Sequence, residues 1–172
     1  MEIITNPHLG QSHAKILDIM DDWNPEEIYR FHQSIGNKET PLIKLPELAE
    51  NLGIANILVK DESCRLGLNS FKPLGASYGI YKEIERNSHI RTFCTATDGN
   101  HGRSVAWMAR KLKKRAVVYV PSGTASERIR CIKQEGAEVE IVDGGYDDTV
   151  RKAMIRCEDE NVISKNDNWA LI

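Results

Sequence analysis

Apolar and polar residues follow a regular rhythm through the second half of the chain. Four segments rich in β-branched residues recur at similar intervals, at residues 91–97, 116–121, 138–143 and 161–165. Between the first two segments, one helical face collects His101, Val105, Met108 and Leu112. Strands that alternate with helices in this way form a parallel sheet with right-handed crossovers. The pattern therefore predicts an α/β fold.

Local signals place the ends of several helices. Thr124 and Glu127 have the spacing of a capping box, and Gly136 is suited to end the same helix in a left-handed conformation. In the less regular first half, Asn24 before Pro25 predicts a helix start, because Asn caps well and proline is favoured in the first turn.

Composition and charge narrow the class of protein. Of the 172 residues, 41% are hydrophobic and 28% charged, as in an ordinary folded domain. The 23 basic and 25 acidic residues nearly cancel, which argues against nucleic acid or an acidic membrane as partner. No apolar run approaches the roughly 20 residues of a membrane helix, and the N-terminus lacks the pattern of a signal peptide. We therefore expect a cytoplasmic protein.

Cysteine, histidine and basic residues add little specific chemistry. The four cysteines form no Cys-x-x-Cys pair and the five histidines no ligand motif, so we expect reduced thiols and no metal site. Residues 110–115 form the densest basic cluster. It is either a phosphate- or nucleic-acid-binding patch or, as we expect, a solvated helix end where the dipole favours cations.

A lysine stands at the start of a predicted helix. Lys72 precedes Pro73, and Leu74, Tyr78 and Tyr81 then continue one helical stripe. A cation at a helix N-terminus opposes the helix dipole, which weakly favours the neutral amine. Lys72 is therefore either a solvated surface lysine or a nucleophile that needs burial or a cofactor to become reactive.

A polar loop rich in glycine follows the first strand of the repeat. Residues 95–102 read Thr-Ala-Thr-Asp-Gly-Asn-His-Gly and lie at the carboxyl end of that strand, where open parallel sheets bind ligands. Backbone N–H groups there can approach an anion or a planar ligand. The same composition is also ordinary turn chemistry. The loop matches neither the dinucleotide-binding Gly-x-Gly-x-x-Gly pattern nor a P-loop.

Taken together, these motifs resemble the fold-type II pyridoxal-phosphate enzymes, the tryptophan synthase β-like superfamily. The resemblance rests on Lys-Asp-Glu at 60–62, Asn-Ser-Phe-Lys-Pro-Leu-Gly-Ala at 69–76 and Thr-Asp-Gly-Asn-His-Gly at 97–102. Similarity to the diaminopropionate ammonia-lyases in particular rests on residues 67–72, 96–103 and 146–151. The resemblance implies the three-layer α/β architecture of that group, with a parallel sheet.

The resemblance also implies a cofactor and roles for several residues. Lys72 would form the internal aldimine with pyridoxal 5′-phosphate, with Phe71 as a neighbouring cofactor-binding residue, and Asn100 would hydrogen-bond the 3′-oxygen of the cofactor. Asp98 is the candidate base that takes the α-proton of the amino-acid substrate. Asp167 is a second candidate aspartate, although the residues around it depart from the family's pattern.

The implied reaction is α,β-elimination of 2,3-diaminopropionate to pyruvate and ammonia. A serine/threonine dehydratase-like enzyme and a non-catalytic remnant α/β domain remain open as alternatives. Family members are longer, and their glycine-rich phosphate-binding loop comes later in the chain; Gly144-Gly145 is too short and reads as a turn after a strand. We therefore expect an N-terminal portion that is not competent alone and works as a homodimer or with a complementary C-terminal chain.

The same resemblance predicts the division into domains. Residues 1–90, with the Lys72 helix, would be the incomplete N-terminal part of the larger domain. Residues 91–165 would form a small α/β domain with four parallel strands, and residues 166–172 a truncated tail. The fold would then stop before the second half of the large domain.

Overall fold

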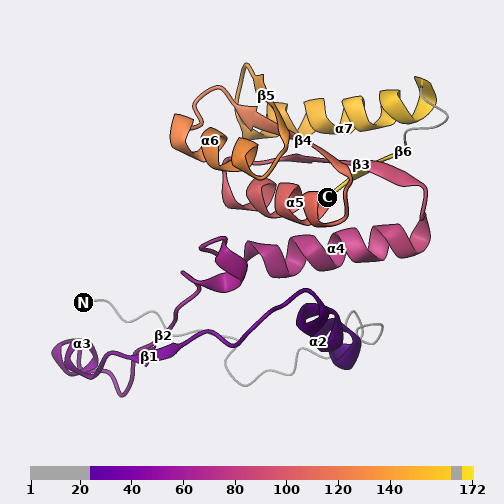
Figure 1. Cartoon of the computed structure of the whole chain (residues 1–172). Coiled ribbons are helices and arrows are strands. Elements are labelled where there is room, and N and C mark those ends of the chain that lie inside the picture. The colour runs from indigo at the N-terminus through magenta and orange to yellow at the C-terminus, as the bar shows by residue number, and fades with distance from the viewer. Residues whose placement is uncertain (1–23, 164–167) are drawn as a thin grey trace, which may run out of the picture.

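The computed structural model describes residues 24–163 and 168–172 (Figure 1). A first group of elements precedes the predicted repeat: α2 (Pro25–Ser34), β1 (Leu42–Lys44), α3 (Pro46–Asn51), β2 (Leu58–Lys60) and the 3₁₀ turn η1 (Arg65–Gly67). The repeat then follows: α4 (Lys72–Arg86), β3 (Ile90–Ala96), α5 (Asn100–Lys111), β4 (Arg115–Pro121), α6 (Ser126–Gln134), β5 (Glu138–Val142), α7 (Tyr146–Ile163) and β6 (Asn168–Leu171).

The strands of the repeat form one parallel sheet. Its order is β5-β4-β3-β6, and pairing joins, for example, Thr95 to Val118 and Val118 to Val139. In Figure 1, α7 covers one face of the sheet, α5 and α6 cover the other, and α4 packs against α5. The prediction of an α/β fold with a four-stranded parallel sheet is confirmed.

The fourth predicted strand is wrong in its position. The prediction placed it at residues 161–165, whereas residues 161–163 continue α7 and the fourth strand is β6. β6 pairs with β3 and buries Trp169 and Ala170. β-branched residues suggested a strand at 161–165, but packing in the fold overrides such propensities in both helices and strands. Residues 168–171 are therefore part of the sheet rather than of a tail, while the division into two domains near residue 90 stays a prediction.

The predicted helix ends are confirmed at two places and wrong at a third. Glu27 N donates to Asn24 Oδ1 at 3.2 Å, and Gly136 has a φ of +90°. The capping box at Thr124 does not form, because α6 begins later and its N-cap residue, Ala125, provides no side-chain cap. Thr124 N donates instead to Pro121 O at 3.0 Å, so this residue belongs to the turn that leaves β4.

The start of α5 is packed tightly against the sheet. A Cβ atom added at Gly102 would lie 2.4 Å from Thr97 Cγ2 and 2.6 Å from Val118 Cγ1. Only a residue without a side chain fits between the helix and the side chains of Thr97 and Val118 at this point. The glycine therefore fixes the distance between α5 and the sheet, and with it the loop at residues 97–101.

Helix α4 is packed on two sides. Ala76 and Ile80 are buried on the side that packs against α5. The predicted stripe with Tyr78 and Tyr81 instead contacts α2, where Phe31 stacks on Tyr81 with 4.7 Å between ring centroids. The helix that begins with Lys72 is thereby held by both α5 and α2.

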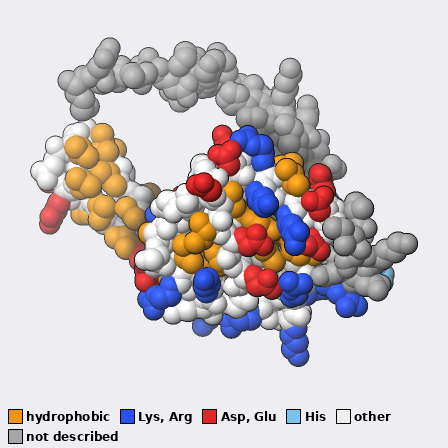
Figure 2. Space-filling view, turned by 90° about the horizontal axis from the view of Figure 1, so that it is seen from above, with side chains coloured by type: hydrophobic (Ala, Val, Ile, Leu, Met, Phe, Trp, Pro, Cys, Tyr) orange, Lys and Arg blue, Asp and Glu red, His pale blue; other side chains and the backbone are white. Residues whose placement is uncertain are grey.

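The residues between 40 and 60 form a projection that we call the hairpin arm. It consists of β1 and β2, which pair antiparallel, and of α3. Its large apolar side chains are substantially exposed; they are Leu42, Ile43, Leu48, Leu52, Ile54, Leu58 and Val59. Figure 1 shows the arm extending away from the sheet, and Figure 2 shows hydrophobic side chains gathered on the projecting lobe. An isolated two-stranded hairpin of this length is at best marginally stable in water.

The basic cluster at residues 110–115 runs from the end of α5 through the following turn to the first residue of β4. Arg110 pairs with Glu135 at 2.6 Å, and Lys111 Nζ donates to the carbonyl of Ile35 at 3.2 Å. Contacts within the chain thus engage two of the cations at a helix end, where the dipole favours positive charge. Within the described ranges, no helix is long and apolar enough to cross a membrane.

Candidate active site

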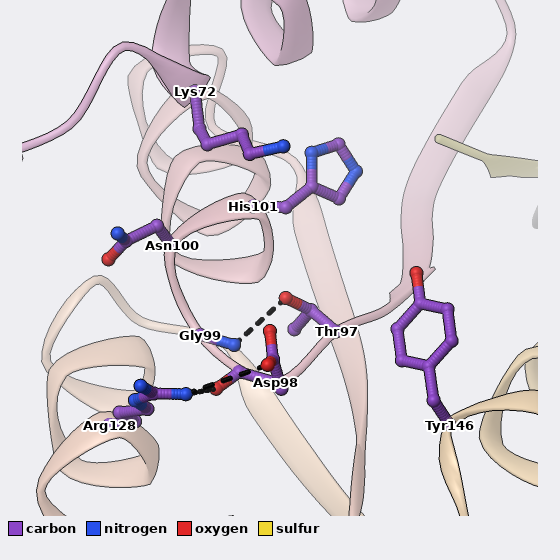
Figure 3. Close-up of a pocket in the computed structure, with 8 residues that line it drawn as sticks. All are labelled: Lys72, Thr97, Asp98, Gly99, Asn100, His101, Arg128 and Tyr146. Atoms are coloured by element: carbon purple, nitrogen blue, oxygen red, sulfur yellow. Dashed lines mark hydrogen bonds and ion pairs between the residues drawn. The ribbon is translucent and has the colours of Figure 1, made fainter. Parts of the chain in front are cut away.

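A cavity of about 500 Å³ opens at the carboxyl end of β3 (Figure 3). The residues that line it come from the starts of α4, α5 and α7, the loop after β3, and α6: Lys72, Thr97, Asp98, Gly99, Asn100, His101, Arg128 and Tyr146. Its size lies within the range of roughly 300–1,000 Å³ typical of small-molecule sites. The predicted lysine and the predicted loop are therefore walls of one cavity.

Lys72 is the first residue of α4, as the sequence predicts. A tight turn brings the chain to it, in which Leu66, Gly67 and Asn69 all have positive φ values, and the Lys72 N–H donates to Ser70 Oγ at 3.3 Å. Figure 3 shows the side chain reaching into the cavity toward His101. No carboxylate of the described residues lies within ion-pair distance of the Lys72 amine.

The turn before Lys72 is anchored by a buried arginine. Arg65 Nε donates to Glu62 Oε2 at 2.7 Å, and its guanidinium also donates to Asn37 Oδ1 and to the carbonyl of Lys38. This contact with Arg65 lowers the pKa of Glu62 from 4.5 to about 2. The contacts with Asn37 and Lys38 tie the segment that enters the hairpin arm to the turn that positions the lysine.

The loop after β3 is shaped by its own hydrogen bonds. Thr97 N donates to Tyr119 O at 2.9 Å, and Gly99 N donates to Thr97 Oγ1 at 3.0 Å. The first helical bond of α5 runs from Arg103 N to Gly99 O, so the N–H groups of the three preceding residues have no acceptor within the helix. The first turn of α5 also carries no acidic residue. This end of the cavity consequently favours negatively charged groups.

Arg128 holds the aspartate of this loop from α6. Its Nη1 atom donates to the main-chain carbonyl of Asp98 at 3.0 Å and lies 3.6 Å from Asp98 Oδ2. The aliphatic part of Arg128 rests against the loop, because a Cβ atom at Gly99 would lie 3.3 Å from Arg128 Cδ. Asp98 is thus held at the cavity wall with its carboxylate exposed to solvent.

His101 and Tyr146 complete the walls. His101 Nε2 lies 3.3 Å from the main-chain oxygen of Ile172, to which Thr95 Oγ1 also donates at 2.7 Å. The oxygen is an acceptor, so this contact requires the proton on Nε2 when the ring is neutral. Tyr146, the first residue of α7, faces the cavity from a different element (Figure 3).

The structure brings together most of the site residues that the sequence predicts. Lys72, Asp98 and Asn100 line the same cavity. Phe71 lies beside the lysine, with its ring centroid 5.2 Å from Lys72 Nζ, but it is largely exposed and is not among the cavity walls. Asp167 lies outside the described residues.

Two further residues were not singled out as site residues from the sequence. Tyr146 belongs to the motif at 146–151, but the motif gives no reason to place it in the same cavity as Lys72. Arg128 lies in a helix with several charged residues, where nothing in the sequence distinguishes it from an ordinary surface arginine. Only the crossover from β4 to α6 brings it to the loop after β3.

The cavity suits a ligand that is anionic and carries an aldehyde. Lys72 offers an amine that can attack a carbonyl carbon, and Arg128 and the N-terminus of α5 favour anionic groups. Asn100 adds an amide that can donate to a ring oxygen. This donor set fits pyridoxal phosphate. In the part of the chain that the structure describes, no cluster of three His, Cys, Asp or Glu side chains could hold a metal ion.

A cavity with a lysine and a polar loop at the carboxyl edge of a parallel sheet is the usual ligand-binding position of open α/β folds. Comparison with known families makes this specific: the chain belongs to the pyridoxal-phosphate dependent enzyme family, which matches residues 34–172. The resemblance to fold-type II enzymes that the motifs indicate is thereby confirmed.

Individual relatives agree with this assignment. Diaminopropionate ammonia-lyase of Escherichia coli strain K12 is 44% identical over 168 residues, a match that covers 87% of this chain and 39% of that protein. The crystal structure of the E. coli enzyme in its apo form superposes with a TM-score of 0.76 and 38% identity, over 100% of this chain and 47% of that one. Tomato (Solanum lycopersicum) threonine dehydratase 1 is 34% identical over 122 residues, which is 71% of this chain and 20% of that protein. The chain therefore spans less than half the length of these relatives.

Proposed function

We propose that this chain carries the cofactor-binding lysine and the proton-accepting carboxylate of an ammonia-lyase that converts 2,3-diaminopropionate to pyruvate and ammonia. The observation that supports this proposal is that Lys72, Asp98 and Asn100 line one cavity although they come from α4, the loop after β3 and α5. The 44% identity with diaminopropionate ammonia-lyase supports the choice of substrate.

Each residue has a task that its position suits. Lys72 would hold pyridoxal phosphate through its amine, with Asn100 and Phe71 as neighbours of the cofactor. When bound, the cofactor supplies an electron sink that makes the α-proton of an amino acid acidic. Asp98 then accepts that proton on a carboxylate oxygen, while the β-amino group leaves as ammonia. Water hydrolyses the released aminoacrylate to pyruvate and a second ammonia. Arg128 keeps the Asp98 main chain in place during the transfer.

Absorbance spectroscopy tests the role of Lys72. Pyridoxal phosphate added to the purified protein is expected to give an absorbance band that Lys72→Ala abolishes, because the band requires a covalent bond to the lysine amine. Lys133→Ala removes an exposed lysine of α6 and is expected to leave the band unchanged. A band of equal strength in Lys72→Ala would overturn the assignment of the lysine, and no band in the wild type would show that this chain alone does not hold the cofactor.

Release of the 2-oxo acid, which is pyruvate from 2,3-diaminopropionate or serine and 2-oxobutyrate from threonine, tests the substrate. With the further polypeptide that catalysis requires supplied, turnover of 2,3-diaminopropionate is expected to exceed turnover of serine and threonine. Asp98→Asn is expected to lower it by about 100-fold or more, the usual contribution of a general base. Faster turnover of serine or threonine would instead favour a dehydratase, which the similarity to tomato threonine dehydratase supports as the second candidate.

The hairpin arm supports a further part of the proposal, namely that catalysis requires polypeptide beyond the described residues. Seven large apolar side chains on one short arm are exposed, and exposed patches of this kind usually mark an interface. The matched relatives are more than twice as long as this chain. We therefore propose that a complementary polypeptide covers the arm. A stable self-association of the chain that Leu58→Ser abolishes would point to a homodimer instead, and full activity of a monomer would contradict both.

A further inference from the structure

Two cysteines meet on the face of the sheet that α7 covers (Figure 1). Cys94 lies within β3 and is fully buried, and Cys157 lies in α7 with 7% of its surface exposed. Both belong to one cluster of buried residues that also contains Ala153. Neither cysteine is among the residues that line the cavity at Lys72, so the proposed function makes no use of them.

One turn of α7 brings the two side chains together. Cys94 Sγ lies 4.0 Å from the carbonyl oxygen of Ala153. In an α-helix that carbonyl accepts the N–H of the residue four positions later, which here is Cys157. The two thiols also share a side-chain hydrogen bond. Ala153 is fully buried at the same turn and contributes only a methyl group, so the cysteines lie at a close contact between helix and strand.

The two thiols differ in reactivity because their surroundings differ. The hydrogen bond with Cys157, together with burial, raises the pKa of the Cys94 thiol, whereas the hydrogen bond from Cys94 lowers the pKa of the Cys157 thiol. The thiolate is the form of cysteine that attacks an oxidant. Cys157 is also the more exposed of the two. An oxidant therefore meets Cys157 first, with Cys94 beside it as a second thiol.

We infer that Cys94 and Cys157 form a redox-active dithiol, which hydrogen peroxide converts to a disulfide between β3 and α7. The Cys157 thiolate attacks one peroxide oxygen; the O–O bond breaks, the leaving hydroxide takes up a proton to become water, and the sulfur becomes a sulfenic acid. The Cys94 thiol then attacks that sulfur; the S–O bond breaks, the S–S bond forms and a second water leaves. Over both steps the thiols lose two electrons and two protons, and the peroxide is reduced to two molecules of water.

The disulfide would join α7 to the sheet. It closes a loop of about 60 residues that contains α5, β4, α6 and β5, and a closed loop of this size restricts the unfolded chain. The oxidised protein should therefore resist unfolding more strongly than the reduced protein. Because α7 begins with Tyr146, one wall of the cavity belongs to the helix that the disulfide would hold.

Peptide mapping after oxidation tests the inference. The purified full chain is treated with hydrogen peroxide, unfolded, alkylated and digested, and mass spectrometry identifies the state of each cysteine. The expected product is a pair of peptides linked through Cys94 and Cys157, lighter than the two separate peptides by two hydrogen atoms and separated by dithiothreitol. If Cys94 is alkylated, and Cys157 is either alkylated as well or carries added oxygen atoms, the inference is wrong.

Variants assign the order of the two steps. In Cys94→Ala the sulfenic acid on Cys157 has no second thiol to meet, so peroxide with dimedone should label Cys157 more strongly than in the wild type. Cys157→Ala retains only the fully buried thiol, and Cys94 should not be labelled. Cys64→Ser is the matched control, because Cys64 is exposed and lies outside the cluster, and it should keep the wild-type cross-link. Labelling of Cys94 but not of Cys157 would overturn the assignment of the attacking thiol.

Urea denaturation tests whether the native packing suits the disulfide. The midpoint of the wild type should rise on oxidation and return with dithiothreitol, while Cys94→Ala should show no shift that dithiothreitol reverses. A lower midpoint in the cross-linked wild type would mean that the disulfide forms only by distorting the contact, which would also overturn the inference. These measurements involve neither cofactor nor the Lys72 amine. A Lys72-dependent absorbance band without the cross-link would contradict the dithiol alone, and the reverse would contradict the proposed function alone.

Discussion

The hairpin arm and the parallel sheet contain similar apolar segments, but only the sheet buries them. β4 runs from Arg115 to Pro121 and buries its five central residues, whereas every residue of β1 and β2 is exposed. β4 lies between two other strands and under helices on both faces, while the arm has only its own hairpin and α3. Apolar sequence therefore indicates that a surface needs covering, and the fold decides whether the same chain covers it.

The candidate site belongs mainly to the buried region. The loop with Asp98 follows β3, α5 is held against the sheet through Gly102, and α4 with Lys72 packs on α5. The arm contributes through its base, where Arg65 joins it to the turn before the lysine. The cavity walls can accordingly be ordered while the surface of the arm remains exposed.

The largest effect is expected from Gly102→Ala. The added Cβ atom would lie 2.4 Å from Thr97 Cγ2 and 2.6 Å from Val118 Cγ1, so α5 must move away from the sheet. We expect the free energy of unfolding to fall by more than about 3 kcal/mol, at the upper end for overpacked cores. Urea denaturation followed by the fluorescence of the buried Trp107 measures this change.

Gly79→Ala is the matched control for this substitution. Gly79 also lies within a helix, but an added Cβ atom would meet nothing within 4 Å. Alanine is the better helix former by about 0.5–1 kcal/mol, so this variant should be equally or more stable. A similar loss of stability in both variants would mean that the contact with the sheet does not account for the effect.

The sequence predicts the buried region better than the rest, for a physical reason. Strands β3, β4 and β5 are flanked by helices with clear periodicity, so their positions follow from the pattern. β6 has only four residues, and nothing in its local sequence shows that it pairs with β3. The cavity wall at Arg128 depends on a crossover between distant elements, so the motifs predict Lys72, Asp98 and Asn100 but miss this arginine.

A smaller effect is expected from acid, through Glu62 at the base of the arm. Arg65 lowers the pKa of Glu62 from 4.5 to about 2, so the folded state binds this proton less readily than the unfolded chain does. The pair's contribution to the free energy of unfolding is complete above about pH 4.5 and is lost as the pH falls toward 2. This contribution has an upper limit of about 3 kcal/mol. Hydrogen exchange of the Leu68 N–H, which donates to Arg65 O at 2.9 Å, reports on this turn once its intrinsic pH dependence is subtracted.

Glu62→Gln shows whether Glu62 or another carboxyl group causes the response of the turn to acid. The variant leaves the buried Arg65 without its carboxylate, so the turn should be less stable at neutral pH and its exchange should no longer change between pH 4.5 and 2. If the variant retained the acid response of the wild type, another carboxyl group would be responsible for it.

The smallest effect tests the comparison most directly, because it applies one substitution to both regions. Val118 in β4 is fully buried and Val59 in β2 is 42% exposed. Val118→Ala should lower the free energy of unfolding by about 2 kcal/mol, through the lost methyl groups and the cavity that remains. Val59→Ala should change it by less than about 0.5 kcal/mol, as is usual for surface positions. The same urea titration measures both variants.

Val59→Ala also tests for a partner when its effect is measured both in the chain alone and with a complementary polypeptide present. In this chain alone, an effect as large as that of Val118→Ala would mean that the arm is already covered in solution, for instance by a second copy. With a complementary polypeptide present, the same small truncation should weaken the association, because the valine then contributes to a buried surface. If Val59→Ala leaves the free energy of unfolding of the free chain unchanged but weakens the complex, the exposed side chains of the arm form an interface.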